Sequence, residues 1–189
     1  MRLPTGDLLA RYAEPHRRYH TLEHIRTCLD HLGEARGIVD GERRVLEAAI
    51  WFHDAIYDPN SSDNEAESAE LARRVLTEAG EPEPVCAEVE RLVRLTASHT
   101  VESGDRLGAV MVSIDLAILG AEPEAYDAYV RQVREEYGQV PELLWRLGRA
   151  GVLRRLLATP VLYADPVFHR RYEERARANL QRELATLED

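Results

Sequence analysis

The sequence predicts one all-α domain, a helical bundle that covers residues 1–189. Apolar residues recur at helical spacing through most of the chain, whereas β-branched residues alternate only briefly, near residues 110–114. The apolar fraction of 44% and the charged fraction of 31% are those of a globular protein. A chain of 189 residues can bury a core without disulfide or metal support, and neither repeats nor long linkers divide it.

Two helices are expected before the first strong turn. One covers residues 21–36 and ends near Gly37. The other covers residues 42–57, where apolar side chains surround most of the circumference, so we expect it to be central and buried. Asp58-Pro59 stops this helix, because proline disfavours helical geometry in the residue before it.

Capping and proline signals predict the remaining helices. Ser62 and Glu65 fit a capping box that opens a helix running to Gly80. Pro82 starts the next helix, whose apolar stripe continues in register to His99. Further helices fit residues 107–119, 123–137, 141–158 and 166–186.

The composition also limits the expected cellular location and the expected binding partners. No apolar stretch is long enough to span a bilayer, and the N-terminus lacks the apolar core of a secretion signal. Cys28 and Cys86 stand alone, which favours packed thiols in a reducing cytoplasm over a disulfide. A net charge of −10 argues against polymeric nucleic acid as a partner, yet it allows a small phosphorylated substrate beside a metal ion. All 24 basic residues are arginine, so lysine chemistry is excluded.

The first candidate site is the segment RYHTLEH, residues 18–24. His20 and His24, at positions i and i+4, share one helix face, where one ring can bind a metal while the other reaches a substrate. With Glu23 the segment also fits the inverted zinc-protease pattern H-x-x-E-H, in which the glutamate is the base. That alternative leaves the charges of His53, Asp54 and Asp115 unpaired.

Two further segments place ionisable groups among apolar residues. His53-Asp54 lies in the most hydrophobic predicted helix, and Asp115 interrupts the apolar run VMVSIDLAILG. Such groups are costly to bury unless they are paired or bound to a cation. Three separate apolar segments thus each offer a metal-type ligand, and facing helices of a bundle can bring such ligands together.

The order of these motifs resembles that of the HD superfamily of metal-dependent phosphohydrolases, and is most similar to small HD-domain proteins without an assigned reaction. The similarity covers most of the chain and rests on four segments: Arg18-Tyr-His20 with His24-Ile25, His53-Asp54 with Tyr57-Asp58-Pro59, Asn64-Glu65 with Ser68-Ala69, and Asp115-Leu-Ala-Ile-Leu-Gly120.

The resemblance implies a helical bundle in which His24, His53, Asp54 and Asp115 hold one metal ion. Such nitrogen and oxygen ligands suit Mn, Fe, Co, Ni or Zn, and Mg less well. The resemblance leaves open whether a second metal ion binds. Metal-bound water is expected to attack phosphorus while Asp54 or Asp115 accepts its proton. Similarity to cyclic-nucleotide phosphodiesterases assigns His20 as the general acid, the alternative being a residue that orients His24.

Other candidates carry weaker signals. His99 follows an apolar stripe and is expected to contact substrate phosphate or a second metal, or to be a hydrogen-bonded core histidine. Arg18 is a candidate phosphate ligand, with a solvated side chain as the alternative. Asp58 fits ordinary turn chemistry, and structural ion pairing is favoured for Glu135.

Two other function classes remain open from the sequence. A metal- and nucleotide-binding sensor would use the same ligands without turnover. A di-iron oxygenase would use histidine and carboxylate ligands too, but the chain lacks the paired Glu-x-x-His signature of bundle di-iron proteins. The predicted function is a cytoplasmic phosphohydrolase that acts on a small phosphorylated molecule, such as a nucleotide.

Overall fold

The structure is a computed structural model that describes residues 5–188. All regular structure in this range is helical, so the predicted all-α class is confirmed. The helices are α1 (Thr5–Tyr12), α2 (Leu22–Glu34), α3 (Asp40–Phe52), α4 (Asn64–Glu78), α5 (Glu83–Leu95), α6 (Arg106–Asp115), the 3₁₀ segment η1 (Leu116–Gly120), α7 (Pro123–Glu136), α8 (Glu142–Ala158) and α9 (Pro166–Glu188).

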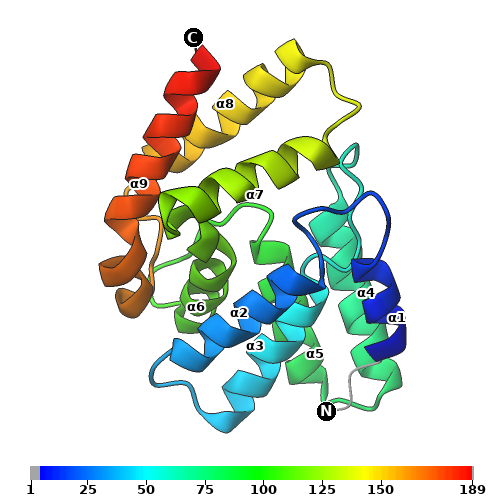
Figure 1. Ribbon diagram of the computed structural model, residues 1–189. Helices are drawn as coiled ribbons and strands as arrows, with labels where there is room; N and C mark the ends of the chain where they lie inside the picture. The colour runs from blue at the N-terminus through cyan, green and yellow to red at the C-terminus, as the bar shows by residue number, and fades with distance from the viewer. Residues whose placement is uncertain (1–4, 189) are drawn as a thin grey trace.

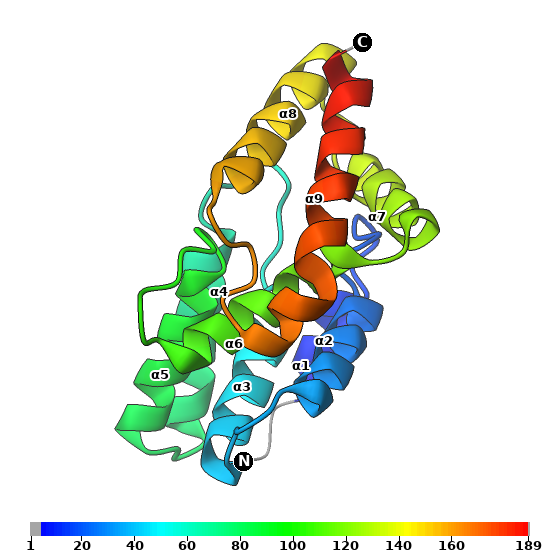
Figure 2. The ribbon, with the colours of Figure 1, turned by 90° about the vertical axis from the view of Figure 1, so that its left-hand side faces the viewer.

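Helix α3 is the central element of the bundle. It packs against α2 on one side and against α4 and α5 on the other, while α6 also contacts it (Figures 1 and 2). Ala48, Ala49 and Ile50 are fully buried, as expected for a helix that is apolar around most of its circumference. Helices α8 and α9 form a hairpin at the far end of the molecule, and α7 crosses between this hairpin and α2 (Figure 1).

The prediction that α3 continues to residue 57 is wrong, because the helix ends at Phe52 and His53 is its C-cap. The reason is a contact with Arg17, whose side chain has no solvent exposure. Its guanidinium donates hydrogen bonds to the carbonyls of Asp54 at 2.7 Å and Ala55 at 3.3 Å. These bonds satisfy carbonyls that a continuing helix would have used, and His53 and Asp54 therefore lie in a turn.

The predicted capping box at the start of α4 is also wrong. Asp63 is the N-cap and its side chain makes no capping hydrogen bond. Asn64 instead closes the preceding loop, since its amide accepts from the backbone of Asp58 at 3.0 Å and donates back to it at 2.9 Å. Asp58 bonds to Asn60 as a turn residue, in agreement with its predicted turn role.

Two other elements differ from the sequence prediction. Helix α5 ends at Leu95 rather than continuing to His99, and the apolar segment around Asp115 changes from α-helix to 3₁₀ helix after that residue. Helix α1 was not predicted; its buried residues Leu8 and Tyr12 are one helical turn apart.

Helix α9 holds the segment that follows Asp115. Asn179 donates to the carbonyls of Leu119 at 2.9 Å and Ala121 at 3.0 Å, and Tyr163 donates to the carbonyl of Leu116 at 2.8 Å. These bonds cap η1 and so restrain the end of α6, where Asp115 lies. Within residues 5–188, no helix has the length and apolar character needed to cross a bilayer.

Candidate metal centre

The four side chains expected to bind a metal meet where three helix ends come together. His24 lies in the first turn of α2, His53 and Asp54 follow the last turn of α3, and Asp115 is the last residue of α6. His24 and His53 are buried, and the Asp54 and Asp115 side chains are 17% and 15% exposed. The site is therefore enclosed, with limited access through the carboxylates.

The facing atoms of this cluster are closely spaced. The two Nε2 atoms of His24 and His53 are 3.2 Å apart. Asp54 Oδ2 lies 3.0 Å from His53 Nε2 and 3.5 Å from His24 Nε2, and Asp115 Oδ1 lies 3.5 Å from each of them. Ligands about 2.1 Å from an ion are about 3.0 Å apart in an octahedron and about 3.4 Å apart in a tetrahedron. The measured spacings match those of atoms arranged around one cation.

The orientation of His53 adds a second reason to expect a cation. Its Nδ1 donates to the Ile50 carbonyl at 2.9 Å, so in the neutral ring Nε2 carries a lone pair that faces the carboxylates. Asp54 Oδ2 is buried and has no hydrogen-bond partner among the described residues. Burial opposes a charge on His53, but Asp54 and Asp115 outweigh it and raise its pKa well above the usual value. The nitrogen and oxygen donors of the cluster are of the kind that bind a divalent ion.

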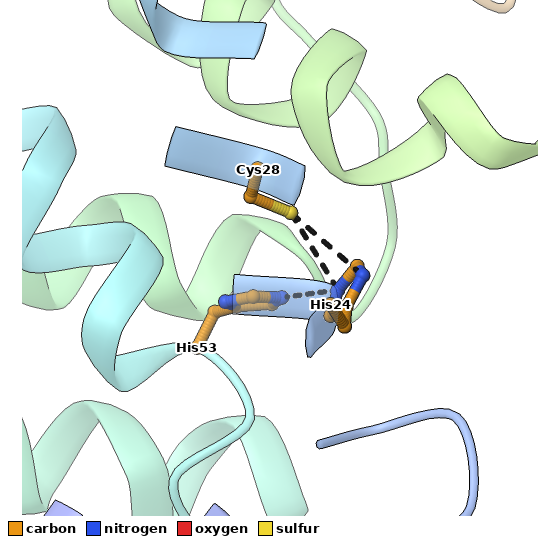
Figure 3. A group of neighbouring side chains, drawn as sticks. All are labelled: His24, Cys28 and His53. Carbon is orange, nitrogen blue, oxygen red and sulfur yellow. Dashed lines mark hydrogen bonds between the residues drawn. The ribbon is translucent and has the colours of Figure 1, made fainter. Parts of the chain in front are cut away.

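Cys28 is a functional candidate that sequence reasoning did not identify. His24, Cys28 and His53 bring ligand atoms within 4.8 Å of one another, and such a group could hold a metal ion (Figure 3). However, Cys28 Sγ lies 3.7 Å from Nε2 and 3.8 Å from Nδ1 of His24, so the sulfur is beside the ring rather than in line with Nε2. Burial, with Asp115 and Asp54, raises the pKa of this thiol. The carboxylates are the better partners for the two imidazoles.

Both cysteines are free and buried, which confirms the expectation of packed thiols.

His20 lies next to this cluster and is bound by a residue that the sequence interpretation missed. Its Nδ1 donates to Glu136 Oε2 at 2.6 Å, and its ring is stacked on Tyr57. Glu136 also accepts from the Tyr57 hydroxyl at 2.9 Å and from the backbone N–H groups of Arg18, Tyr19 and His20 at 2.7–3.0 Å. No hydrogen bond within the described part of the chain engages His20 Nε2.

His20 and Glu136 shift each other's pKa. Burial lowers the pKa of His20, but Asp54 and Glu136 raise it above the usual value. Burial raises the pKa of Glu136, while the bonds from His20 and the backbone lower it to about 2. The pair therefore favours a charged imidazolium that can donate a proton from Nε2.

A pattern in the sequence could have identified Glu136. It continues the inward stripe of Tyr126, Tyr129 and Val133, whereas Glu135 points outward, 3.6 Å from the Arg18 side chain. A carboxylate on the buried stripe of an amphipathic helix needs a partner, and here the partner is His20.

His99 reaches the cluster through Asp115. Its Nε2 donates to Asp115 Oδ2 at 3.0 Å, on the opposite side of the carboxylate from the oxygen that faces the two imidazoles. His99 also has a φ of +54°, the only positive value of a non-glycine residue in the described range. This left-handed conformation costs about 1–2 kcal/mol for a residue with a Cβ.

A cavity of about 360 Å³ opens beside the cluster, between α2, η1 and α7. His24 and Asp115 line it, together with Arg18 and Gln132. The Arg18 guanidinium donates to the carbonyls of Pro15 and Arg17, which holds it at the cavity wall. Its position is compatible with the predicted contact to substrate phosphate.

The zinc-protease alternative is not supported by the geometry. Its base would be Glu23, which lines the cavity beside the cluster but has a side chain that is 79% exposed and lies 3.7 Å from Arg26. No contact joins Glu23 to the cluster among residues 5–188.

Comparisons with protein families, curated proteins and solved structures give no match to this chain.

Proposed function

We propose that this protein is a metal-dependent phosphohydrolase that acts on a small phosphorylated molecule. The observation that carries the proposal is the convergence of two imidazoles and two carboxylates: the two Nε2 atoms are 3.2 Å apart, and each carboxylate lies 3.0–3.5 Å from both of them. His24, His53, Asp54 and Asp115 would hold one divalent ion, and their nitrogen and oxygen donors suit Mn, Fe, Co, Ni or Zn better than Mg. The similarity of the motifs to HD phosphohydrolases supports the same assignment.

The chain supplies the groups that move protons. His24, His53, Asp54 and Asp115 would hold the ion, which would supply an activated water and offset phosphate charge. Asp54, whose side chain keeps 17% exposure beside the cluster, is assigned to accept the proton that such a water would lose. His20 is assigned to protonate the departing oxygen through Nε2, because Glu136 holds its Nδ1 and stabilises its charged form.

The cavity beside Asp115 is assigned to the substrate. Arg18 in its wall is the proposed partner of a phosphate oxygen, since guanidinium groups bind phosphate with directed hydrogen bonds. Together with the ion, this arginine offsets locally the net charge of −10. The free, buried thiols fit a reducing cytoplasm, which we propose as the location.

The test is phosphate release from a panel of phosphomonoesters, phosphodiesters and nucleoside triphosphates, with each candidate metal added in turn. We expect metal-dependent release that Asp115→Asn abolishes and Asp58→Asn preserves, because the Asp58 carboxylate bonds to Asn60 outside the cluster.

The main alternative is a metal- and nucleotide-binding sensor. Saturable nucleotide binding without phosphate release from any compound, under any metal, would replace the hydrolase proposal with this function. Two bound irons and dioxygen uptake would instead indicate an oxygenase.

A further inference from the structure

His99 occupies a backbone position where glycine is the usual residue. Its N–H donates to the carbonyl of Leu95 at 3.0 Å, which closes a helical turn after α5. Its positive φ then ends that turn in the manner of an αL cap. The other positive-φ residues of the described chain, Gly37, Gly80 and Gly104, are all glycines.

The strained conformation directs the His99 side chain to one specific atom. Nε2 lies 3.0 Å from Asp115 Oδ2. The other carboxylate oxygen, Oδ1, lies 3.5 Å from the Nε2 atoms of both His24 and His53. The Asp115 carboxylate therefore bridges His99 on one side and the cluster on the other.

We infer that His99 is a positioning residue, which fixes the Asp115 carboxylate so that Oδ1 points toward the side chains of His24, His53 and Asp54. The inference rests on the proposed metal site and adds to it a residue that does not itself touch the ion. Unfavourable backbone geometry persists where the surrounding structure requires it, and it is concentrated at functional sites. A hydrogen bond from outside the ligand set orients a ligating carboxylate in the same way.

This role differs from the substrate contact expected from the sequence. The ring nitrogen that reaches the site is already engaged with Asp115 and is not left for a phosphate. Substrate affinity should therefore depend on His99 only through the metal.

The test compares two variants that keep the same backbone strain. His99→Gln retains a donor near the place of Nε2, whereas His99→Leu retains volume without a donor. Mn²⁺ and Zn²⁺ affinities are measured by calorimetry on the full chain, without substrate. We expect His99→Leu to lose about 10–100-fold in metal affinity. His99→Gln should stay within about threefold of the unmodified protein, because it preserves the bond to Asp115.

A third variant addresses folding. His99→Gly places the usual residue at this cap, so it should fold even if the leucine variant does not, and it should lose metal affinity to the same extent. Far-UV circular dichroism and the urea midpoint check that each variant is folded.

The outcomes separate this inference from the function. Equal metal affinity in all folded variants would overturn the positioning role but leave the proposed metal site intact. A higher KM in a variant whose metal affinity is unchanged would overturn the positioning role as well. If the leucine and glycine variants lose metal affinity, and neither the unmodified protein nor any variant has phosphoesterase activity, the positioning role is supported and the hydrolase proposal is rejected. Failure of the unmodified protein to bind either ion would overturn both.

Discussion

His53 Nε2 lies 3.0 Å from Asp54 Oδ2, so two residues that are neighbours in the sequence direct their side chains at each other. Adjacent residues in a straight helix point about 100° apart and would meet less easily. His53 is the C-cap of α3, with φ −59° and ψ −35° and an N–H that donates to the Ala49 carbonyl, and Asp54 follows it in a turn. The C-terminal end of α3 thus contributes two facing groups to the cluster.

Asp115→Asn should weaken the binding of one divalent ion per chain by at least about 100-fold, because it removes one negative ligand from a buried site. Asp58→Asn is the matched control, since its side chain lies in an exposed turn. Calorimetry and elemental analysis measure both variants. Equal metal content in the two would contradict the assignment of Asp115.

Cys28→Ala should bind the same ions with affinity within about threefold of the unmodified protein, because the carboxylates face the two imidazoles more directly than the sulfur does. The sulfur lies beside the His24 ring rather than in line with its Nε2. A large loss of Zn²⁺ affinity, with little change for Mn²⁺, would show that the thiolate is a ligand after all.

His20→Gln should reduce kcat by about 10²–10⁴-fold while leaving metal affinity unchanged, because it removes the general acid and no metal ligand. Glu136→Gln should also reduce kcat, since the 2.6 Å bond that holds His20 would lose its charge. Glu135→Gln is the control, because that carboxylate is exposed and its nearest cation is Arg18 at 3.6 Å. Steady-state kinetics would contradict the assignment if Glu135→Gln and Glu136→Gln behaved alike.

The stability contributed by Glu136 should depend on pH. Its pKa falls from the ordinary 4.5 to about 2 in the folded protein, so its contribution is fully present above about pH 4.5 and is lost as the pH falls toward 2. Thermal unfolding at pH 6 and pH 3 should therefore show a large difference between the unmodified protein and Glu136→Gln at pH 6, and a smaller one at pH 3. A difference independent of pH would refute the role of the ionised carboxylate.

Arg17→Met should lower the free energy of unfolding by about 2–4 kcal/mol, because it leaves buried carbonyls without donors. The guanidinium bonds the carbonyls of His20, Asp54 and Ala55. Arg18→Met, at a side chain that is 48% exposed, should cost less than about 1 kcal/mol. Chemical denaturation of the two variants provides the comparison, and similar losses would count against Arg17 as the cap of α3.

The sequence by itself determined the helical class and the side chains of the cluster. Helical periodicity shows which face of each segment is buried, and a charged residue on such a face must find a partner or a cation. That reasoning drew attention to His53, Asp54 and Asp115, and the resemblance to HD phosphohydrolases added His24; the structure places the four side chains together.

Only the tertiary structure decided which distant groups serve the site. Glu136 lies 116 residues from His20, and no local pattern states that the two meet. Likewise, Arg17 ends α3 from a separate loop, and His99 adopts a strained turn to reach Asp115. Periodicity is a property of neighbours along one helix, whereas these contacts depend on how the helices pack, and so the partners of the site residues emerge only when the chain has folded.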